Sequence, residues 1–272
     1  MKKNPGRSKR HIQPACLITG ASGGIGLALA HQAAAAGRNL ALVARSEARL
    51  QEIAAELHSR YGVQTWVVAL DLAQPGAPQQ LARALERLGV EVEILLNNAG
   101  VLEQGAFIEI SPERHQQIID LNISALTAML GVFLPGMLAR KTGKIMNVAS
   151  IAAFQPVVGL ACYAASKAYV LSLSEALAEE CRGSGVTVTA LCPGITDTGM
   201  MQYAQGKNQQ LRIPAAVIAD PDTVARQAWA ALEAGQAVIT PGLLNQAAVL
   251  ASRATPKWLV RRISGLLGRS AI

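Results

Sequence analysis

Apolar and polar residues form two kinds of segment that alternate along the chain. Short apolar runs, such as ACLITG (15–20) and LALVAR (40–45), are separated by longer stretches that are typical of helices. Continuous apolar strands separated by helices indicate a parallel sheet that is covered on both faces. We therefore predict an α/β fold with a doubly wound, seven-stranded parallel sheet. The expected strands are residues 15–20, 40–45, 65–72, 92–100, 143–150, 185–194 and 237–242.

Helices are expected between these strands, and two of them have recognisable first turns. Ser46 is a suitable N-cap with Glu47 after it, and Asp220 is a suitable N-cap with Pro221 after it. The predicted helices are residues 24–37, 46–60, 79–89, a long helix within 112–140, 161–183 and 219–235. In a sheet of this kind the ligand crevice lies at the carboxyl ends of the strands.

The composition favours one large domain in a reducing compartment. Of 272 residues, 51% are hydrophobic and 16% are charged, which is ample for one core. No run of about 18 apolar residues occurs, so no transmembrane helix is expected. We expect a tail (1–12), one domain (13–242) and an extension (243–272). The four cysteines have no metal-binding spacing, so we expect no metal, free thiols and a cytoplasmic location.

The net charge of +7 is concentrated at the two ends of the chain. Residues 1–11 carry five basic side chains and no acid, and residues 240–272 carry five more, again without an acid. The first segment is expected to be a disordered tail, and no nucleic-acid partner is expected because no aromatic residues interleave with the charges. Within 257–267, apolar and basic residues fall on opposite sides of a helix. Such a helix either packs on protein or makes a peripheral contact with an anionic membrane.

The segment TGASGGIG (19–26) joins the first expected strand to the first helix. Gly20 permits a tight turn, and Gly24 and Gly26 leave room for a pyrophosphate and a neighbouring strand. The helix N-terminus presents free N–H groups to an anion. A strand-to-helix turn with spare glycines is the alternative, but the position favours a dinucleotide-binding Rossmann fold. The candidate contacts are Gly20, Ser22, Gly23, Gly24, Ile25 and Gly26.

The end of the second strand distinguishes NADP from NAD. An acid at this position binds the ribose 2′-hydroxyl of NAD, but this chain has Ala44 followed by Arg45. A guanidinium can pair with a 2′-phosphate, and Ser46 can donate to the same group. The sequence therefore favours NADP over NAD, with a simple loop cation as the alternative.

A tyrosine and a lysine lie four residues apart in LACYAASKAYVLS (160–172), so Tyr163 and Lys167 share one helix face. A phenol has a pKa near 10, and a nearby ammonium lowers that pKa toward the range that acid–base catalysis needs. The pair is therefore a candidate proton donor to a carbonyl or base for an alcohol. A packing tyrosine and a solvated lysine are the alternative, and we expect Tyr169 to be a packing residue.

These features occur with others in an order that resembles the short-chain dehydrogenase/reductase family. The motifs are TGASGGIG, NNAG (97–100), Asn122, Ser150, YAASK and PGITDT, and the resemblance covers roughly residues 12–242. It implies that Tyr163 is the general acid/base and that Lys167 lowers its pKa and holds the nicotinamide ribose. It also implies that Ser150 bonds the substrate oxygen and that Asn122 holds a water. A helix cap and a buried amide are the ordinary alternatives for Ser150 and Asn122.

The resemblance also implies further cofactor contacts. Asp71 and Leu72 would bracket the adenine, and Ile195 and Thr198 would fix the nicotinamide carboxamide. Gly23 stands where one NADP-binding subfamily has a basic residue, so the NADP preference rests on Arg45. The remaining cofactor candidates are Asn98, Gly100, Pro193 and Gly194.

The expected substrate is a lipophilic ketone or aldehyde that is reduced. The stretch after Ser150 is nearly all apolar and includes Phe154, and Met200 and Met201 lie in an expected lid at about 196–220. The resemblance implies a homodimer or homotetramer. An alcohol or hydroxysteroid-type dehydrogenase working oxidatively and a non-catalytic dinucleotide-sensing scaffold are the alternatives.

Overall fold

A computed structural model of the 272-residue chain describes residues 12–200, 217–255 and 262. The expected basic tail, most of the expected lid with Met201, and nearly all of the predicted amphipathic helix within 257–267 lie outside the described residues.

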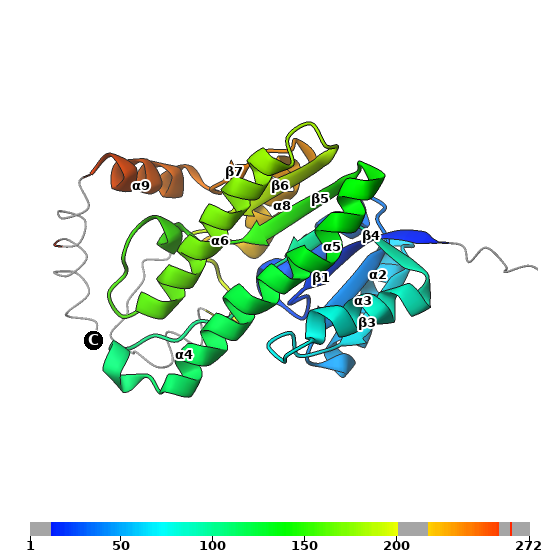
Figure 1. The fold of residues 1–272 in the computed structure, drawn as a ribbon, viewed down its shortest axis with the longest axis horizontal. Coiled ribbons are helices and arrows are strands. Elements are labelled where there is room, and N and C mark those ends of the chain that lie inside the picture. The colour runs from blue at the N-terminus through cyan, green and yellow to red at the C-terminus, as the bar shows by residue number, and fades with distance from the viewer. Residues whose placement is uncertain (1–11, 201–216, 256–261, 263–272) are drawn as a thin grey trace, which may run out of the picture.

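Seven parallel strands form one sheet in the order β3-β2-β1-β4-β5-β6-β7 (Figure 1). The predicted doubly wound sheet is confirmed, since the chain starts in the middle and moves first to one edge and then to the other. The apolar runs form the strands because both faces of the sheet are covered. The last strand is shorter than predicted, with two residues. The strands are β1 Gln13–Thr19, β2 Leu40–Ala44, β3 Thr65–Ala69, β4 Val90–Asn97, β5 Gly143–Val148, β6 Val186–Leu191 and β7 Val238–Ile239.

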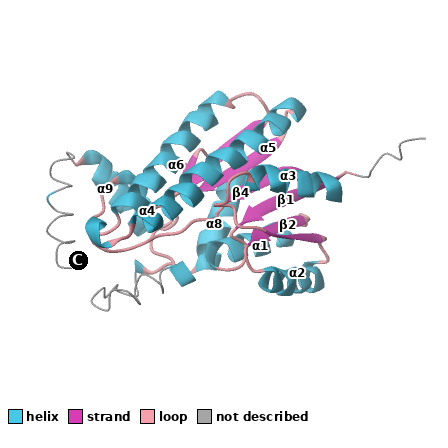
Figure 2. Cartoon of the chain, turned by 60° about the horizontal axis from the view of Figure 1, so that its bottom comes forward, coloured by secondary structure: helices cyan, strands magenta, loops and turns pink. Residues whose placement is uncertain are grey.

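Helices cover both faces of the sheet (Figure 2). The helices α3, α5 and α6 pack on one face, and α1, α2 and α8 pack on the other. Both predicted caps are present, because Ser46 accepts from Arg49 N and Asp220 accepts from Thr223 N. The helices are α1 Gly24–Ala35, α2 Glu47–Tyr61, α3 Ala77–Leu88, α4 Pro112–Ile119, α5 Leu126–Arg140, α6 Ala161–Glu180, α8 Pro221–Glu233 and α9 Leu243–Ala254.

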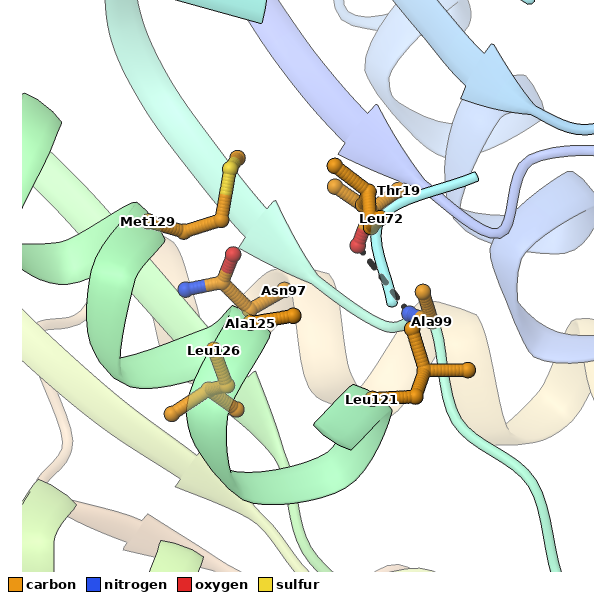
Figure 3. A pocket seen from close by; sticks show the side chains of 8 residues that line it. All are labelled: Thr19, Leu72, Asn97, Ala99, Leu121, Ala125, Leu126 and Met129. Carbon is orange, nitrogen blue, oxygen red and sulfur yellow. Dashed lines mark hydrogen bonds between the residues drawn. The ribbon is translucent and has the colours of Figure 1, made fainter. Parts of the chain in front are cut away.

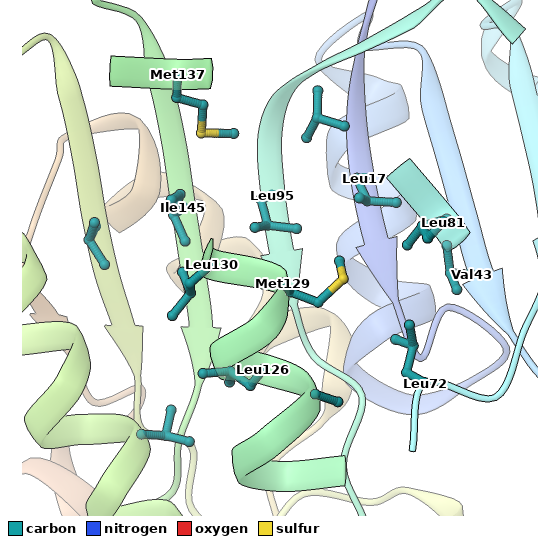
Figure 4. Packing of buried hydrophobic residues seen from close by; sticks show 14 of the residues in the cluster. Leu17, Val43, Leu72, Leu81, Leu95, Leu126, Met129, Leu130, Met137 and Ile145 are labelled. Carbon is teal, nitrogen blue, oxygen red and sulfur yellow. The ribbon is translucent and has the colours of Figure 1, made fainter. Parts of the chain in front are cut away.

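The core on the α3–α5–α6 face is aliphatic (Figure 4). Leu17 and Leu95 from the sheet, Leu81 from α3 and Met129 from α5 are all buried in it. The four cysteines are free thiols, and Cys16, Cys181 and Cys192 are buried. This packing fixes the carboxyl ends of β1, β4 and β5 relative to the helices that carry the candidate site.

The predicted long helix within 112–140 is interrupted by a π-helical segment, η2, at Asp120–Ala125. The continuous run Pro112–Arg140 is long and apolar enough to cross a membrane, which the sequence did not lead us to expect. Length and composition alone support that reading, and in the structure the run packs on the sheet through Leu126, Met129 and Leu130. π-Helical segments are rare and often occur at functional sites, and this one contains Asn122.

Candidate active site

The glycine turn has the conformation that the sequence predicts. Gly20 and Gly24 have φ of 66° and 54°, in the left-handed region that favours glycine. A Cβ on Gly26 would lie 2.3 Å from the carbonyl oxygen of Gly20, so the helix could not approach the turn with any other residue there. The Gly23 N-cap of α1 has no capping side chain, so the first N–H groups of the helix are available to an anion. The turn therefore fits the pyrophosphate of a dinucleotide.

Thr19 and Asn98 connect the glycine turn to NNAG at the end of β4. The Thr19 hydroxyl accepts hydrogen bonds from the N–H groups of Asn98 and Ala99, both at 3.0 Å. The Asn98 amide donates to the carbonyls of Thr19 at 3.0 Å and of Gly20 at 3.2 Å. Asn98 thus shapes the turn as well as bordering it. Sequence reasoning missed Thr19, although a hydroxyl that ends a buried strand was a usable signal.

A small cavity lies beside this connection (Figure 3). Its volume is about 10 Å³, which is room for about one water molecule. Leu72, predicted beside the adenine, lines it, while the Asp71 carboxylate accepts from Ala73 N at 3.1 Å. The lining residues are Thr19, Leu72, Asn97, Ala99, Leu121, Ala125, Leu126 and Met129.

Arg45 directly follows β2, at the same edge of the sheet as the glycine turn. Its side chain is exposed, and it has no acidic partner within residues 12–200, 217–255 and 262. Ser46 caps α2, so its hydroxyl is oriented at the helix N-terminus. A free guanidinium beside a helix N-terminus is a suitable pair for a phosphate monoester.

Lys167 is buried on α6, and its side chain lies next to that of Tyr163. Its Nζ donates to the carbonyl of Val148 at 2.8 Å and lies 5.7 Å from the centroid of the Tyr163 ring. Burial lowers the pKa of Lys167 to about 8. Gly100 makes room for this arrangement, because a Cβ there would lie 3.3 Å from Lys167 Nζ. The solvated lysine that was the ordinary alternative is therefore excluded.

The structure brings Ser150 and Tyr163 together, as the sequence predicts. Burial raises the pKa of Tyr163, and a hydrogen bond with Ser150 opposes that increase. Burial is the larger of these two effects, so the pKa of the phenol lies above its ordinary value, in contrast to the lowering that the resemblance implies. Ser150 also accepts from Ala152 N at 3.1 Å, as the N-cap of the 3₁₀ turn η3 (Ile151–Phe154). The serine is both a cap and a neighbour of the phenol.

Asn122 connects the π-helical segment η2 to NNAG and to α6. Its Oδ1 accepts from Val101 N at 2.9 Å, and its Nδ2 donates to Val101 O at 2.9 Å and to Ser166 Oγ at 3.0 Å. Ser166 in turn donates to the carbonyl of Tyr163 at 2.7 Å. Both amide protons bind protein acceptors, so the water that the resemblance implies would have to bind an oxygen of Asn122. Sequence reasoning missed Ser166, which stands inside the YAASK motif.

The PGITDT segment closes the site from the β6 side. The carbonyl of Pro193 accepts from Ile151 N at 3.0 Å. A Cβ on Gly24 would lie 2.9 Å from Thr198 Cγ2, so the Thr198 side chain lies against the glycine turn. On the other side, a Cβ on Gly194 would lie 2.5 Å from the Asn245 side chain of α9.

The apolar candidates for the substrate side are only partly covered. Phe154 and Met200 are half-buried, and Ile195, which was predicted as a cofactor contact, is 37% exposed. Tyr169 is not the packing residue that the sequence suggested. It is 38% exposed, since it follows Tyr163 by six residues on α6, and its hydroxyl lies 2.9 Å from Thr127 Oγ1 on α5.

Comparison with known proteins identifies similar chains. The family model described as "short chain dehydrogenase" matches residues 14–209. A ketoacyl reductase named for the granaticin polyketide synthase of Streptomyces violaceoruber is 40% identical over 193 residues, which are 70% of each chain. A human relative named "Inactive hydroxysteroid dehydrogenase-like protein 1" is 35% identical over 68% of this chain and 56% of its own length.

Solved structures share the arrangement of the chain. A 7β-hydroxysteroid dehydrogenase has a TM-score of 0.83 with 27% identity, over 93% of this chain and 96% of its own. A short-chain dehydrogenase from Sphingobium yanoikuyae in complex with NADPH has a TM-score of 0.78 with 33% identity, over 88% of this chain and 93% of its own.

Proposed function

The chain belongs to the short-chain dehydrogenase/reductase family, and from that premise we propose that it reduces a lipophilic ketone or aldehyde with NADPH. The family assignment makes it an oxidoreductase that acts on hydroxyl or ketone groups. The observation that carries the finer proposal is the meeting of Ser150, Tyr163 and buried Lys167 beside the glycine turn.

These side chains supply the proton and the positive charge that a carbonyl reduction needs. Ser150 donates a hydrogen bond to the substrate oxygen, and the Tyr163 hydroxyl gives its proton to that oxygen. The nicotinamide, when bound, supplies the hydride to the carbonyl carbon, so that one hydride and one proton convert the carbonyl to the alcohol. The pKa of Lys167, at about 8, leaves this side chain mainly protonated at neutral pH. Its ammonium then stabilises the tyrosinate left after proton transfer.

Several residues are proposed to hold the dinucleotide. The free N–H groups at the start of α1 would bind the pyrophosphate, and Leu72 and Asp71 would border the adenine. Exposed Arg45, with Ser46, would pair with the 2′-phosphate of NADP. The NADPH complex of the similar Sphingobium yanoikuyae enzyme supports a nicotinamide dinucleotide.

The proposed substrate is a lipophilic carbonyl compound. Phe154 lies in the 3₁₀ turn that Ser150 caps and is half-buried, as Met200 is, so both can offer apolar contacts to a substrate. The names of a ketoacyl reductase and a hydroxysteroid dehydrogenase among similar proteins support a ketone. The hydroxysteroid dehydrogenase also favours a second candidate, oxidation of an alcohol at the same site.

We further propose a cytoplasmic homodimer or homotetramer that pairs through α5 and α6, where Tyr169 is exposed.

A panel of carbonyl compounds tests the proposal directly. Purified protein is incubated with NADPH and each ketone or aldehyde, and consumption is followed at the NADPH absorbance band. Turnover of apolar ketones above that of small polar ones supports the proposal. If only alcohols with NADP⁺ or NAD⁺ react, the oxidative function replaces it. If no compound reacts in either direction, a non-catalytic dinucleotide-binding role, as the name of the inactive human relative suggests, replaces it.

A further inference from the structure

Helix α9, the first part of the C-terminal extension, carries an exposed stripe made only of leucine and alanine. At 3.6 residues per turn, six exposed side chains fall within an arc of about 120° on this helix, and no polar residue lies between them. Leu243 is the most exposed of them, at 83%. A stripe of this width on a soluble helix is normally turned toward a core. Its members are Leu243, Leu244, Ala247, Leu250, Ala251 and Ala254.

The opposite side of α9 is fixed to the candidate active site. Asn245 packs against Gly194 of PGITDT and donates to the carbonyl of Pro241 at 2.8 Å. The helix also contacts η3, which follows Ser150. Most of the apolar stripe therefore faces away from the body, while Leu250 at its edge also lines a hollow beside Val238 and Ile239 of β7. Helix α9 lies at the end of the molecule toward which the strands run (Figures 1 and 2).

A second exposed apolar pair lies at the same end. Phe107 and Ile108 are 62% and 92% exposed in the 3₁₀ turn η1 (Phe107–Glu109), which leads into α4. Both Figure 1 and Figure 2 place α4 and α9 at one end of the molecule. Large exposed apolar side chains gathered near a site mark a surface that is covered in use.

The charge of the surrounding sequence indicates what covers this surface. Residues 240–272, which include α9, carry five basic side chains and no acidic one. A second copy of the chain placed on α9 would bring two such acid-free segments together, and like charges oppose that pairing. An anionic lipid surface accepts both leucine side chains and basic residues.

We propose that α9 lies on the headgroup region of an anionic lipid bilayer. The leucine–alanine stripe inserts at the boundary with the acyl chains, and the acid-free, basic sequence of residues 240–272 favours a surface of negative charge. The candidate active site then opens next to the membrane, where a lipophilic carbonyl compound accumulates. This placement goes beyond the proposed reaction, which does not require it.

Sedimentation of the full chain with vesicles tests the proposal. We expect binding to vesicles of phosphatidylcholine with phosphatidylglycerol, and at least tenfold weaker binding to phosphatidylcholine alone. The double variant Leu243→Ser/Leu250→Ser should bind anionic vesicles at least tenfold more weakly. The triple variant Lys257→Gln/Arg261→Gln/Arg262→Gln should lose the preference for anionic lipid.

The matched control removes two exposed apolar side chains that lie outside the proposed subunit contact, Ile12 before β1 and Leu88 at the end of α3. Ile12→Ser/Leu88→Ser should bind vesicles as the unmodified chain does. Absence of binding by the unmodified chain, or an equal loss in this control, would overturn the proposal. So would conversion of an oligomer to a monomer by the α9 variant without any vesicle binding, since a second copy would then be the occupant. Turnover of a water-soluble ketone, measured on the same samples, tests the proposed reaction separately.

Discussion

Single residues are proposed to select the cofactor and to bind it. Tyr163, Lys167 and the glycines could be singled out because of their spacing, their positions after strands and their occurrence together with the other motifs. Ser166 could not be singled out, because a lone hydroxyl in a helix has many ordinary roles and only the folded chain shows its partners; for Thr19 the signal was its place at the end of a buried strand. The sequence therefore predicts the candidate reactive side chains, and the structure adds the residues that hydrogen-bond to them or to their loops.

Arg45→Asp should reverse the cofactor preference. The substitution removes the cation proposed for the 2′-phosphate and introduces a carboxylate that repels it. Loss of a charge-assisted hydrogen bond of about 1.5–3 kcal/mol predicts at least a tenfold rise in the KM for NADPH. Steady-state kinetics with NADPH and NADH measure the change. The control Arg87→Asp makes the same charge change at an exposed position of α3 and should leave the KM values for NADPH and NADH unchanged. An unchanged cofactor preference in Arg45→Asp would show that another residue selects the cofactor.

Gly26→Ala should abolish dinucleotide binding. The new Cβ would lie 2.3 Å from the carbonyl oxygen of Gly20, which is main chain and cannot move without opening the turn. Titration of the variant by NADPH fluorescence measures the loss. Gly131→Ala is the control, because no atom lies within 4 Å of a Cβ in that position on α5. Normal NADPH affinity in Gly26→Ala would contradict the proposed geometry of the turn.

Elements of secondary structure position the reactive groups. The apolar runs predicted six of the seven strands well, because burial on both faces leaves a clear signal, whereas two-residue β7 is short enough for its ends to be misjudged. The π-helical segment was not predictable, since apolar spacing does not distinguish one wide turn within a long helix. The hydrogen bonds of Asn122, which lies in this segment, with Val101 and Ser166 are seen only in the structure.

Ser166→Ala should weaken the connection between the π-helical segment and α6. The change leaves one buried Asn122 N–H without its acceptor, which costs about 1–3 kcal/mol of unfolding free energy. Urea unfolding measures this loss, and turnover should fall with it because Tyr163 and Lys167 are on the same helix. Thr127→Ala removes an exposed hydroxyl from α5 and should cost less than about 0.5 kcal/mol. Equal stabilities of the two variants would show that the Asn122–Ser166 bond does not stabilise the fold.

The folded molecule buries Lys167, and burial makes the protonated form of this side chain less favourable than it is in the unfolded chain. The pKa of Lys167 falls from an ordinary value of 10.5 to about 8 on burial, so the unfolded chain binds its proton more tightly than the folded chain between these values. Stability linked to this group therefore rises as pH increases through that window. Relative to Lys167→Met, the native chain should gain about 2 kcal/mol of unfolding free energy between pH 7.5 and 9.5. Urea unfolding of both chains at the two pH values measures this gain. If the difference in unfolding free energy between the native chain and Lys167→Met does not change with pH, the pKa of Lys167 is not lowered in the folded chain.

The whole fold followed from the sequence more readily than the ends of the chain did. Alternating strands and helices imply the sheet order, because right-handed crossovers leave few alternatives. The attachment of α9 to Gly194 was not implied, since it depends on a glycine and an asparagine 51 positions apart, with no pattern to connect them. The expected boundary at residue 242 thus falls directly before a helix that touches the candidate site.

The central claim is that Tyr163 gives the proton in an NADPH-dependent carbonyl reduction. The measurement is turnover of the best carbonyl compound by Tyr163→Phe, together with NADPH affinity by fluorescence titration. The substitution removes only the hydroxyl, so NADPH should bind within about twofold of the native affinity while turnover falls about 10²- to 10⁴-fold, the usual effect of losing a general acid. Native NADPH affinity with more than a tenth of native turnover would contradict the claim.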